Sequence, residues 1–163
     1  MASAVVRLRL YMENFGLTEA RVHATAFMVW LAAATGWFAA TVLRKHPERF
    51  LSGCVTGAFV ILLGLALVNP QDLVARTNLG RAGEGKELDA AYLGSLDADA
   101  VPAIAAYWPA LDNEHKCTLW QRLLQKWTAP DEDWRRWNLA RSRAVRAVAA
   151  LQPPGCPSGG GPR

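Results

Sequence analysis

Two long apolar runs dominate the first half of the chain. Residues 22–43 contain no Asp, Glu, Lys or Arg, and residues 51–68 are also free of charge. At 1.5 Å per residue the first run spans about 33 Å as a helix, enough for a hydrocarbon core of about 30 Å. The second run is shorter, and Phe50 and Asn69 extend it. Because a short polar loop joins the runs, we expect a hairpin of two transmembrane helices over residues 22–69.

Small residues in both runs would let the two helix backbones approach closely. The spacing Gly53-x-x-x-Gly57 is a pattern of packed membrane helices, although glycine is common in such helices in any case. Other small residues of the two runs are Ala33, Ala34, Gly36 and Gly64.

Two other interpretations of the apolar runs are less favoured. A pair of buried helices in a soluble domain would need a very large core around both runs. A signal peptide would fit the first run, because basic residues precede it and residues 32–34 are alanines. However, the apolar run continues for nine residues beyond Ala34 and a second run follows, which disfavours a cleaved signal.

After Asn69 the pattern changes to short stretches with helical spacing, separated by Gly, Pro and Asp. No alternation typical of strands appears, so we expect this part to be helical as well. The fold class is therefore all-α: a two-helix transmembrane hairpin followed by a small extramembrane bundle of short helices. Its expected parts are a juxtamembrane amphipathic segment (1–21), the hairpin (22–69), a helical domain (70–152) and a flexible tail (153–163).

Helix starts in the second half are predicted from capping residues. Asn69 before Pro70 predicts a helix to about Leu79, and Asp97 and Asp112 predict starts of helices that end near residues 107 and 127. The remaining helices are expected over 86–96 and from Thr128 or Asp131 to about Leu151.

Five of the seven tryptophans lie in this second half. Trp120, Trp127 and Trp134 are seven residues apart, but Pro130 interrupts the continuous helix that a heptad seam would need. We therefore interpret these tryptophans as core anchors of antiparallel helix pairs; exposed rings that stack on a ligand are the alternative.

Charge limits the classes of partner. The mean hydropathy of +0.05 averages two apolar spans with a water-facing domain. From Pro70 onward there are 12 basic and 11 acidic residues, so this part is nearly neutral and we expect no nucleic-acid binding. The lipid bilayer and other membrane helices or subunits are the expected partners.

Basic residues beside the spans bear on topology. The connecting loop contains Arg44, Lys45 and Arg49, which favours a cytoplasmic loop with both termini outside. Arginines before the first span and after the second nearly balance them. The expected anchors at the membrane edge are Tyr11, Glu19, Arg21, Arg44, Lys45 and Arg49.

The three cysteines differ in setting. Cys54 lies within the second span and suits a packing role. Cys117 and Cys156 lie in the polar second half, where a disulfide would pin the Pro/Gly-rich tail to the helix that contains Cys117. Two free thiols in a reducing compartment are the alternative. A disulfide would agree with an extracytoplasmic domain.

No catalytic, cofactor-binding or metal-ligating constellation is found in the sequence. There is no CxxC or HExxH motif, and the glycines at 80, 83 and 85 do not follow a strand as a dinucleotide-binding motif requires. Asp89, Asp97 and Asp99 are better explained as helix-capping or ion-paired residues than as catalytic carboxylates. We name no catalytic residue, cofactor or metal.

Several segments resemble a known family: RLRLYMENFGLTEAR (7–21), NPQDLVARTNLGR (69–81), LDAAYLGSLDADAVPAI (88–104) and DWRRWNLARSRA (133–144). They are similar to the C-terminal part of DUF4173, a family of bacterial multi-spanning membrane proteins of unknown function. Phe15 and Ala20 depart from the expected pattern. Because such proteins are typically much longer, the resemblance implies a truncated product or a C-terminal fragment.

The sequence favours an integral protein of the bacterial inner membrane, multi-pass, with its C-terminal domain outside. We expect a noncatalytic assembly or interaction module. The alternative is a fragment of a transporter or membrane-embedded enzyme whose working residues lie upstream. A regulator that senses outside conditions through Cys117 and Cys156 is a third hypothesis.

Overall fold

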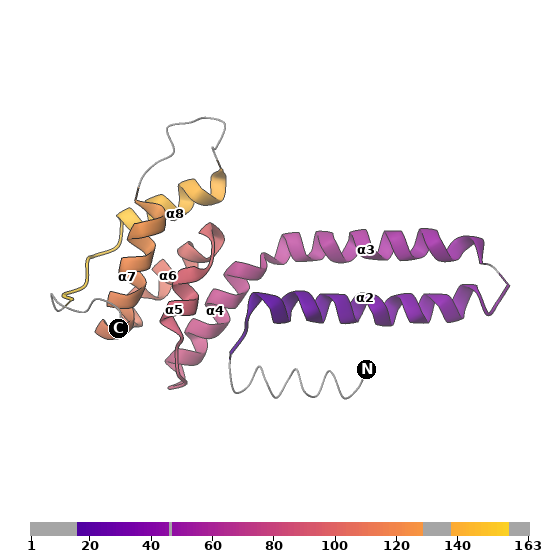
Figure 1. The fold of residues 1–163 in the computed structure, drawn as a ribbon, viewed down its shortest axis with the longest axis horizontal. Coiled ribbons are helices and arrows are strands. Elements are labelled where there is room, and N and C mark those ends of the chain that lie inside the picture. The colour runs from indigo at the N-terminus through magenta and orange to yellow at the C-terminus, as the bar shows by residue number, and fades with distance from the viewer. Residues whose placement is uncertain (1–15, 46, 129–137, 157–163) are drawn as a thin grey trace. The chain divides into compact units, whose positions relative to one another are not determined.

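The structure, a computed structural model, describes residues 16–45, 47–128 and 138–156. Every regular element among these residues is a helix, which confirms the all-α class (Figure 1). The chain divides into two compact units, Met1–Pro70 and Gln71–Arg163. The elements are α2 (Glu19–Thr41), α3 (Glu48–Val68), α4 (Pro70–Gly83), α5 (Ala90–Ser95), the 3₁₀ helix η1 (Ala98–Ala100), α6 (Val101–Tyr107), the 3₁₀ helix η2 (Trp108–Ala110), α7 (Asn113–Trp127) and α8 (Leu139–Ala149).

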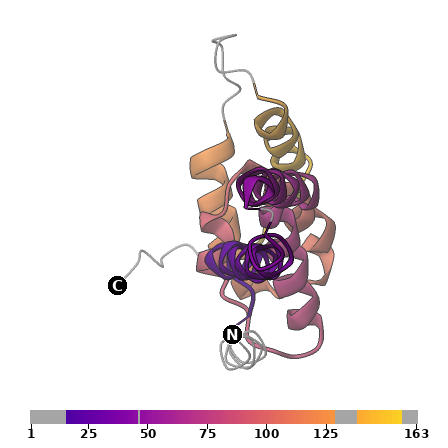
Figure 2. The ribbon, with the colours of Figure 1, turned by 90° about the vertical axis from the view of Figure 1, so that its right-hand side faces the viewer.

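The first unit contains a hairpin of α2 and α3, which lie side by side in both ribbon views (Figures 1 and 2). Two tryptophans of α2 connect the helices. The indole N–H of Trp30 donates to the carbonyl of Cys54 at 3.3 Å, and that of Trp37 donates to the carbonyl of Arg49 at 3.1 Å. The pairing therefore uses directed hydrogen bonds as well as apolar contact.

Three glycines of α3 were predicted to permit close approach of the two helices, but the partner helix comes close to only one of them. A Cβ on Gly53 would overlap the indole of Trp37, whereas a Cβ on Gly57 or Gly64 would meet nothing within 4 Å. The close approach is thus local to Gly53 and Trp37, and the expected packing by a series of small residues is confirmed at that position alone.

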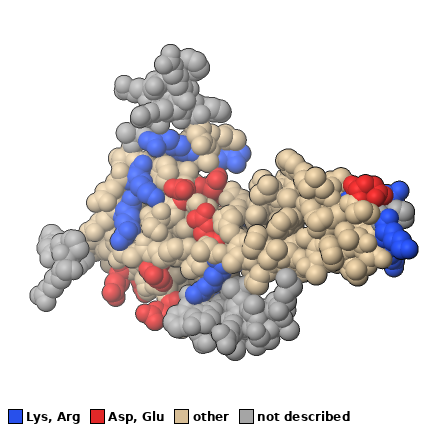
Figure 3. All heavy atoms as spheres, turned by 45° about the vertical axis from the view of Figure 1, so that its right-hand side comes forward, with Lys and Arg blue, Asp and Glu red and all other residues tan. Residues whose placement is uncertain are grey.

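Both helices of the hairpin expose apolar side chains. Phe59 is 68% exposed and Leu67 is 78% exposed, and the apolar stretch of α3 has no buried residue. On the face shown in Figure 3 the flank of the hairpin carries no charge, and charged side chains gather at its tip. Each helix is long and apolar enough to cross a membrane, which agrees with association of this unit with a bilayer.

Asn69 lies directly before α4, as predicted, and it also ends α3. Its backbone is left-handed, with φ of 51°, and its N–H donates to the carbonyl of Leu65 at 3.1 Å. Asparagine tolerates this conformation better than most residues, so it suits a helix C-terminus. Pro70 then occupies the first position of α4, where its missing N–H has no helical partner to lose.

The second unit surrounds a small apolar core. Trp108 and Trp127 are 6% and 8% exposed, which confirms the expected anchoring role for these two rings, whereas Trp134 and Trp137 lie outside the described residues. α5 packs against α7, and α8 packs against η1, α6 and α7. The largest fully buried side chains are those of Val74, Leu93, Val101, Ile104, Leu119 and Leu123.

One predicted helix start is wrong, and another falls outside the described residues. α5 begins at Ala90 and not at residue 86, because the Asp89 carboxylate accepts the N–H of Tyr92 at 2.8 Å and caps the helix there. α8 begins at Leu139, because Asn138 is extended and its side chain accepts the N–H of Ala140. The predicted start at Asp131 lies outside the described residues.

The helix predicted from Asp97 to residue 107 is divided in two. It starts as η1 and continues as α6, in which Pro102 lies in the first turn. Proline lacks an N–H and its ring crowds the carbonyl four residues earlier, so a 3₁₀ turn before it avoids both conflicts.

Candidate functional site

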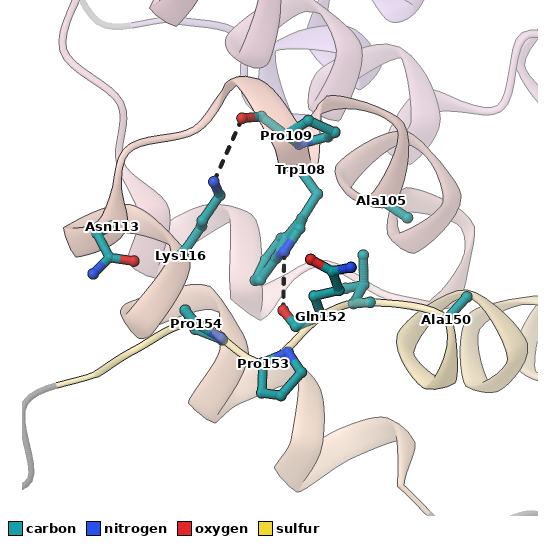
Figure 4. A pocket seen from close by; sticks show the side chains of 10 residues that line it. Ala105, Trp108, Pro109, Asn113, Lys116, Ala150, Gln152, Pro153 and Pro154 are labelled. Atoms are coloured by element: carbon teal, nitrogen blue, oxygen red, sulfur yellow. Dashed lines mark hydrogen bonds between the residues drawn. The ribbon is translucent and has the colours of Figure 1, made fainter.

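Residues 152–156, which we call the strap, follow α8 and lie against η2 and the start of α7 (Figure 4). The indole N–H of Trp108 donates to the carbonyl of Gln152 at 3.3 Å, and the side-chain amide of Asn113 donates to the carbonyl of Gly155 at 3.2 Å. Cys156 forms a disulfide with Cys117 of α7, with 5.6 Å between their Cα atoms. Three contacts therefore hold the strap in place.

The disulfide closes a large loop within the second unit. Cys117 and Cys156 are 39 residues apart in sequence. In the chain-entropy description, a loop of this size stabilises the folded unit by about 4 kcal/mol. The start of the tail that was expected to be flexible from residue 153 is thus fixed through residue 156. Residues 157–163 lie outside the described part of the chain.

A pocket of about 470 Å³ lies beside the strap (Figure 4). Its apolar walls include the Trp108 ring, Pro109 and the two prolines of the strap, and the ammonium group of Lys116 donates to the carbonyl of Pro109 at 3.4 Å. Apolar walls with a few hydrogen-bonding groups are typical of small-ligand and peptide sites. The lining residues are Ala105, Trp108, Pro109, Asn113, Lys116, Ala150, Leu151, Gln152, Pro153 and Pro154.

The first turn of α7 positions Asn113, Lys116 and Cys117. The carboxylate of Asp112 caps this turn by accepting the backbone N–H of His115 at 2.9 Å, and it also faces Nδ1 of His115 at 2.7 Å. The backbone hydrogen bond from His115 lowers the pKa of Asp112, with smaller contributions from the charges of His115 and Lys116. The charged carboxylate is therefore the form that supports this end of the helix.

The other end of α7 is tied to α5. The ammonium group of Lys126 donates to the carbonyls of Ser95 at 2.8 Å and Leu96 at 3.2 Å, and lies 3.8 Å from the carboxylate of Asp97. These carbonyls belong to the C-terminal end of α5, where helical partners are lacking. Lys126 thus fixes α7, and with it the wall of the pocket, to the rest of the unit.

Polar contacts also join α4 to η1 and stabilise α4 itself. The side-chain amide of Gln71 accepts the N–H of Asp97 at 2.6 Å and donates to its carboxylate at 3.3 Å. Within α4, Asp72 pairs with Arg76 at 2.7 Å, and this hydrogen bond raises the pKa of Arg76. Asp89 and Asp97 therefore act in capping and inter-helix contacts, and we assign them no catalytic role.

The predicted membrane-edge residues occupy the ends of the hairpin. Glu19 and Arg21 lie in the first turn of α2, and the Arg21 side chain donates a hydrogen bond to the carbonyl of Gly16, which precedes the helix. Exposed side chains of the connecting loop and the first turn of α3 belong to Arg44, Lys45 and Arg49. Tyr11 lies outside the described residues. Among the described residues, no group of three or more His, Cys, Asp or Glu is placed to hold a metal ion.

Trp108 and Asn113 are residues of this site that no sequence pattern indicates. The pairing of Trp108 with Gln152 spans 44 residues, and that of Asn113 with Gly155 spans 42. No local pattern encodes such contacts. The cysteines were the only signal, because a Cys117–Cys156 bond would bring the residues next to Cys156 close to the first turn of α7.

The first 107 residues match the domain of unknown function DUF4153. The chain belongs to the DUF4153 family. The match to DUF4153 includes the hairpin and extends through α6, so Trp108, the strap and its disulfide lie beyond it. No curated protein and no solved structure matches the chain.

The DUF4153 match corrects the family expected from the sequence. The quoted segments resemble DUF4173, whereas the family that matches is DUF4153, a domain of unknown function. The segments are short, and the last one, 133–144, lies outside the matched range. They were therefore too few to separate one such family from another.

Proposed function

We propose that this protein is an integral, multi-pass protein of the bacterial inner membrane that holds its C-terminal unit on the extracytoplasmic side as a noncatalytic assembly or interaction module. The Cys117–Cys156 disulfide carries the proposal. Disulfides persist in oxidising compartments, and this one fixes a strap that lines a pocket of about 470 Å³, a volume typical of ligand-binding sites.

The charges at the hairpin tip support the same orientation. Arg44, Lys45 and Arg49 lie on the connection between the two spans or just after it, and positive residues are retained on the cytoplasmic side. A cytoplasmic tip places the end of α3, and the unit that follows, on the opposite side. The exposed apolar side chains of the hairpin fit a lipid bilayer and other membrane helices or subunits as partners.

Thiol labelling in intact cells tests the compartment. We use the full chain with Cys54→Ser, so that Cys117 and Cys156 are the only thiols. A membrane-impermeant maleimide added from outside should label both cysteines only after treatment with a reductant. Labelling of both from the cytoplasmic side without reductant would contradict the proposal.

Site-specific photocrosslinking in native membranes tests the interaction role. A photoreactive residue replaces Lys116 at the pocket in one variant and the exposed Glu87 in a matched control. We expect one defined adduct from position 116 that co-purifies with the full chain and is absent from position 87. Equal adduct patterns, or none at position 116, would refute a binding role for this surface.

A further inference from the structure

We propose that the surface formed by Trp108, Asn113 and Cys117 is a binding site for extended, proline-containing peptide segments, and that the strap occupies it in cis while the disulfide is intact. This inference rests on the proposed function and names the chemical class of the partner. The strap is itself such a segment, with the sequence Gln-Pro-Pro-Gly-Cys.

The surface contacts the strap through backbone carbonyls. Trp108 and Asn113 each donate one side-chain N–H to a strap carbonyl, at residues 152 and 155. These carbonyls exist in any peptide, so the two hydrogen bonds set the path of the chain and leave its side chains free to vary. A different segment with the same backbone path would satisfy both donors.

The prolines explain why this path suits a peptide in trans. Proline restricts the backbone and favours extended, polyproline-type conformations, so a Pro-Pro segment loses less conformational entropy on binding. Aromatic-lined grooves commonly recognise such segments. Here Pro153 and Pro154 line the pocket together with the Trp108 ring and Pro109 (Figure 4), which supplies the apolar part of the contact.

The disulfide keeps the cis segment bound. Without it, two long hydrogen bonds and the proline contacts remain, and hydrogen bonds between neutral, partly exposed groups contribute little to stability. Reduction by a dithiol transfers two electrons and two protons, giving two cysteine thiols and oxidising the dithiol to a disulfide. The strap is then held by weak contacts alone and can be displaced.

Disulfide trapping tests the peptide preference on the full chain. The Cys54→Ser, Cys156→Ser variant has Cys117 as its only thiol. Two capped peptides, QPPGC and QGGGC, carry thionitrobenzoate on their cysteine. The Cys117 thiolate attacks the peptide sulfur, a Cys117–peptide disulfide forms, and thionitrobenzoate leaves with the electron pair of the broken S–S bond, giving a coloured signal. We expect QPPGC to react at least tenfold faster than QGGGC.

Two substitutions separate recognition from general reactivity. Trp108→Leu removes the aromatic ring that lies beside the prolines, and it should bring the QPPGC rate close to that of QGGGC. Trp120→Leu is the matched control, because its ring packs 6.2 Å from that of Trp108 and it should preserve the difference. Equal rates for the two peptides, or a preference unaffected by Trp108→Leu, would overturn the proposal.

The indole N–H resonance of Trp108 tests whether the strap is displaceable. In the Cys54→Ser chain, reduction with dithiothreitol should shift this NMR signal and speed its hydrogen exchange at least tenfold, while the signal of the buried Trp127 stays in place. An unmoved Trp108 signal, or movement of both signals through unfolding, would overturn the proposal that reduction makes the strap displaceable. Equal peptide rates alongside a specific adduct at position 116 would refute the peptide class and leave the interaction module intact.

Discussion

The Asp112 carboxylate links the stability of the second unit to pH. Its pKa is lowered from the ordinary value of 3.8, chiefly by the hydrogen bond from the His115 backbone. A lowered pKa means that the stabilisation is fully present above the ordinary value and is lost as pH falls through the folded-state value. We expect the melting temperature of the wild-type unit to fall as pH is lowered below about 4.

Asp112→Asn isolates that contribution. Asparagine still accepts a hydrogen bond at a helix start, but it does not titrate, so the variant should lose less stability than the wild type between pH 5 and pH 2, pH values chosen to bracket the transition. Circular dichroism melts at both pH values measure the difference. The exposed carboxylate of Glu87 provides the control, because Glu87→Gln should reproduce the wild-type profile. Parallel profiles for Asp112→Asn and wild type would show that the Asp112 cap does not cause the loss of stability at low pH.

Lys126 makes a second testable contribution at the residue scale. Its ammonium group supplies donors to two carbonyls at the end of α5. Hydrogen bonds from charged groups contribute about 1.5–3 kcal/mol, and the 41% exposure of this side chain reduces the expected value to about 1 kcal/mol. Lys126→Met should lower the free energy of unfolding of the second unit by that amount in urea titrations. Lys86→Met, at an exposed position before α5, should have almost no effect, and equal losses would contradict the clamp.

At the scale of elements, the α2–α3 hairpin depends on one small residue. A Cβ at Gly53 would overlap the Trp37 indole, which also donates to Arg49, whereas Gly57 has open space at the same point. Overpacking typically costs about 1–3 kcal/mol. Gly53→Ala should therefore destabilise the hairpin by that amount, and Gly57→Ala should not. Hydrogen exchange of the Trp37 indole N–H, measured by NMR in detergent, compares the two variants; an equal response would refute a local contact.

Element boundaries were predictable where a capping residue stands directly before a stretch with helical spacing. Asp112 before α7 was predicted correctly. Asp89 was missed because Leu88 continues the apolar spacing of α5, so only the hydrogen bond from the Tyr92 N–H reveals the start. Asn69 correctly predicted the start of α4 at Pro70, and its left-handed backbone shows that it also ends α3.

At the scale of the whole molecule, the hydrophobic pattern predicted a membrane-associated hairpin and a separate helical unit. A helix in lipid is apolar along a continuous run of residues, whereas a helix beside a small core has apolar residues on one face only. The candidate site was predictable only through its cysteines. Trp108 and Asn113 meet the strap across more than 40 residues of sequence, and their role depends on where α8 delivers the chain. Tertiary packing sets that position, so no local signal encodes it.

Orientation is the last property of the whole molecule that the charges predict. Arg44, Lys45 and Arg49 are exposed at the hairpin tip, while the segments that flank the two spans, which the proposed topology puts on the opposite side, also carry arginines. Because the two sides are nearly balanced, removing the three tip charges should invert a large share of the molecules. The triple Gln variant should then show the C-terminal thiols on the cytoplasmic side, as measured by impermeant maleimide before and after cell lysis. Glu48→Gln is the control, since acidic residues contribute little to orientation, and it should leave the labelling unchanged. An unchanged orientation in the triple variant would mean that the flanking segments, and not the tip, determine which side the second unit occupies.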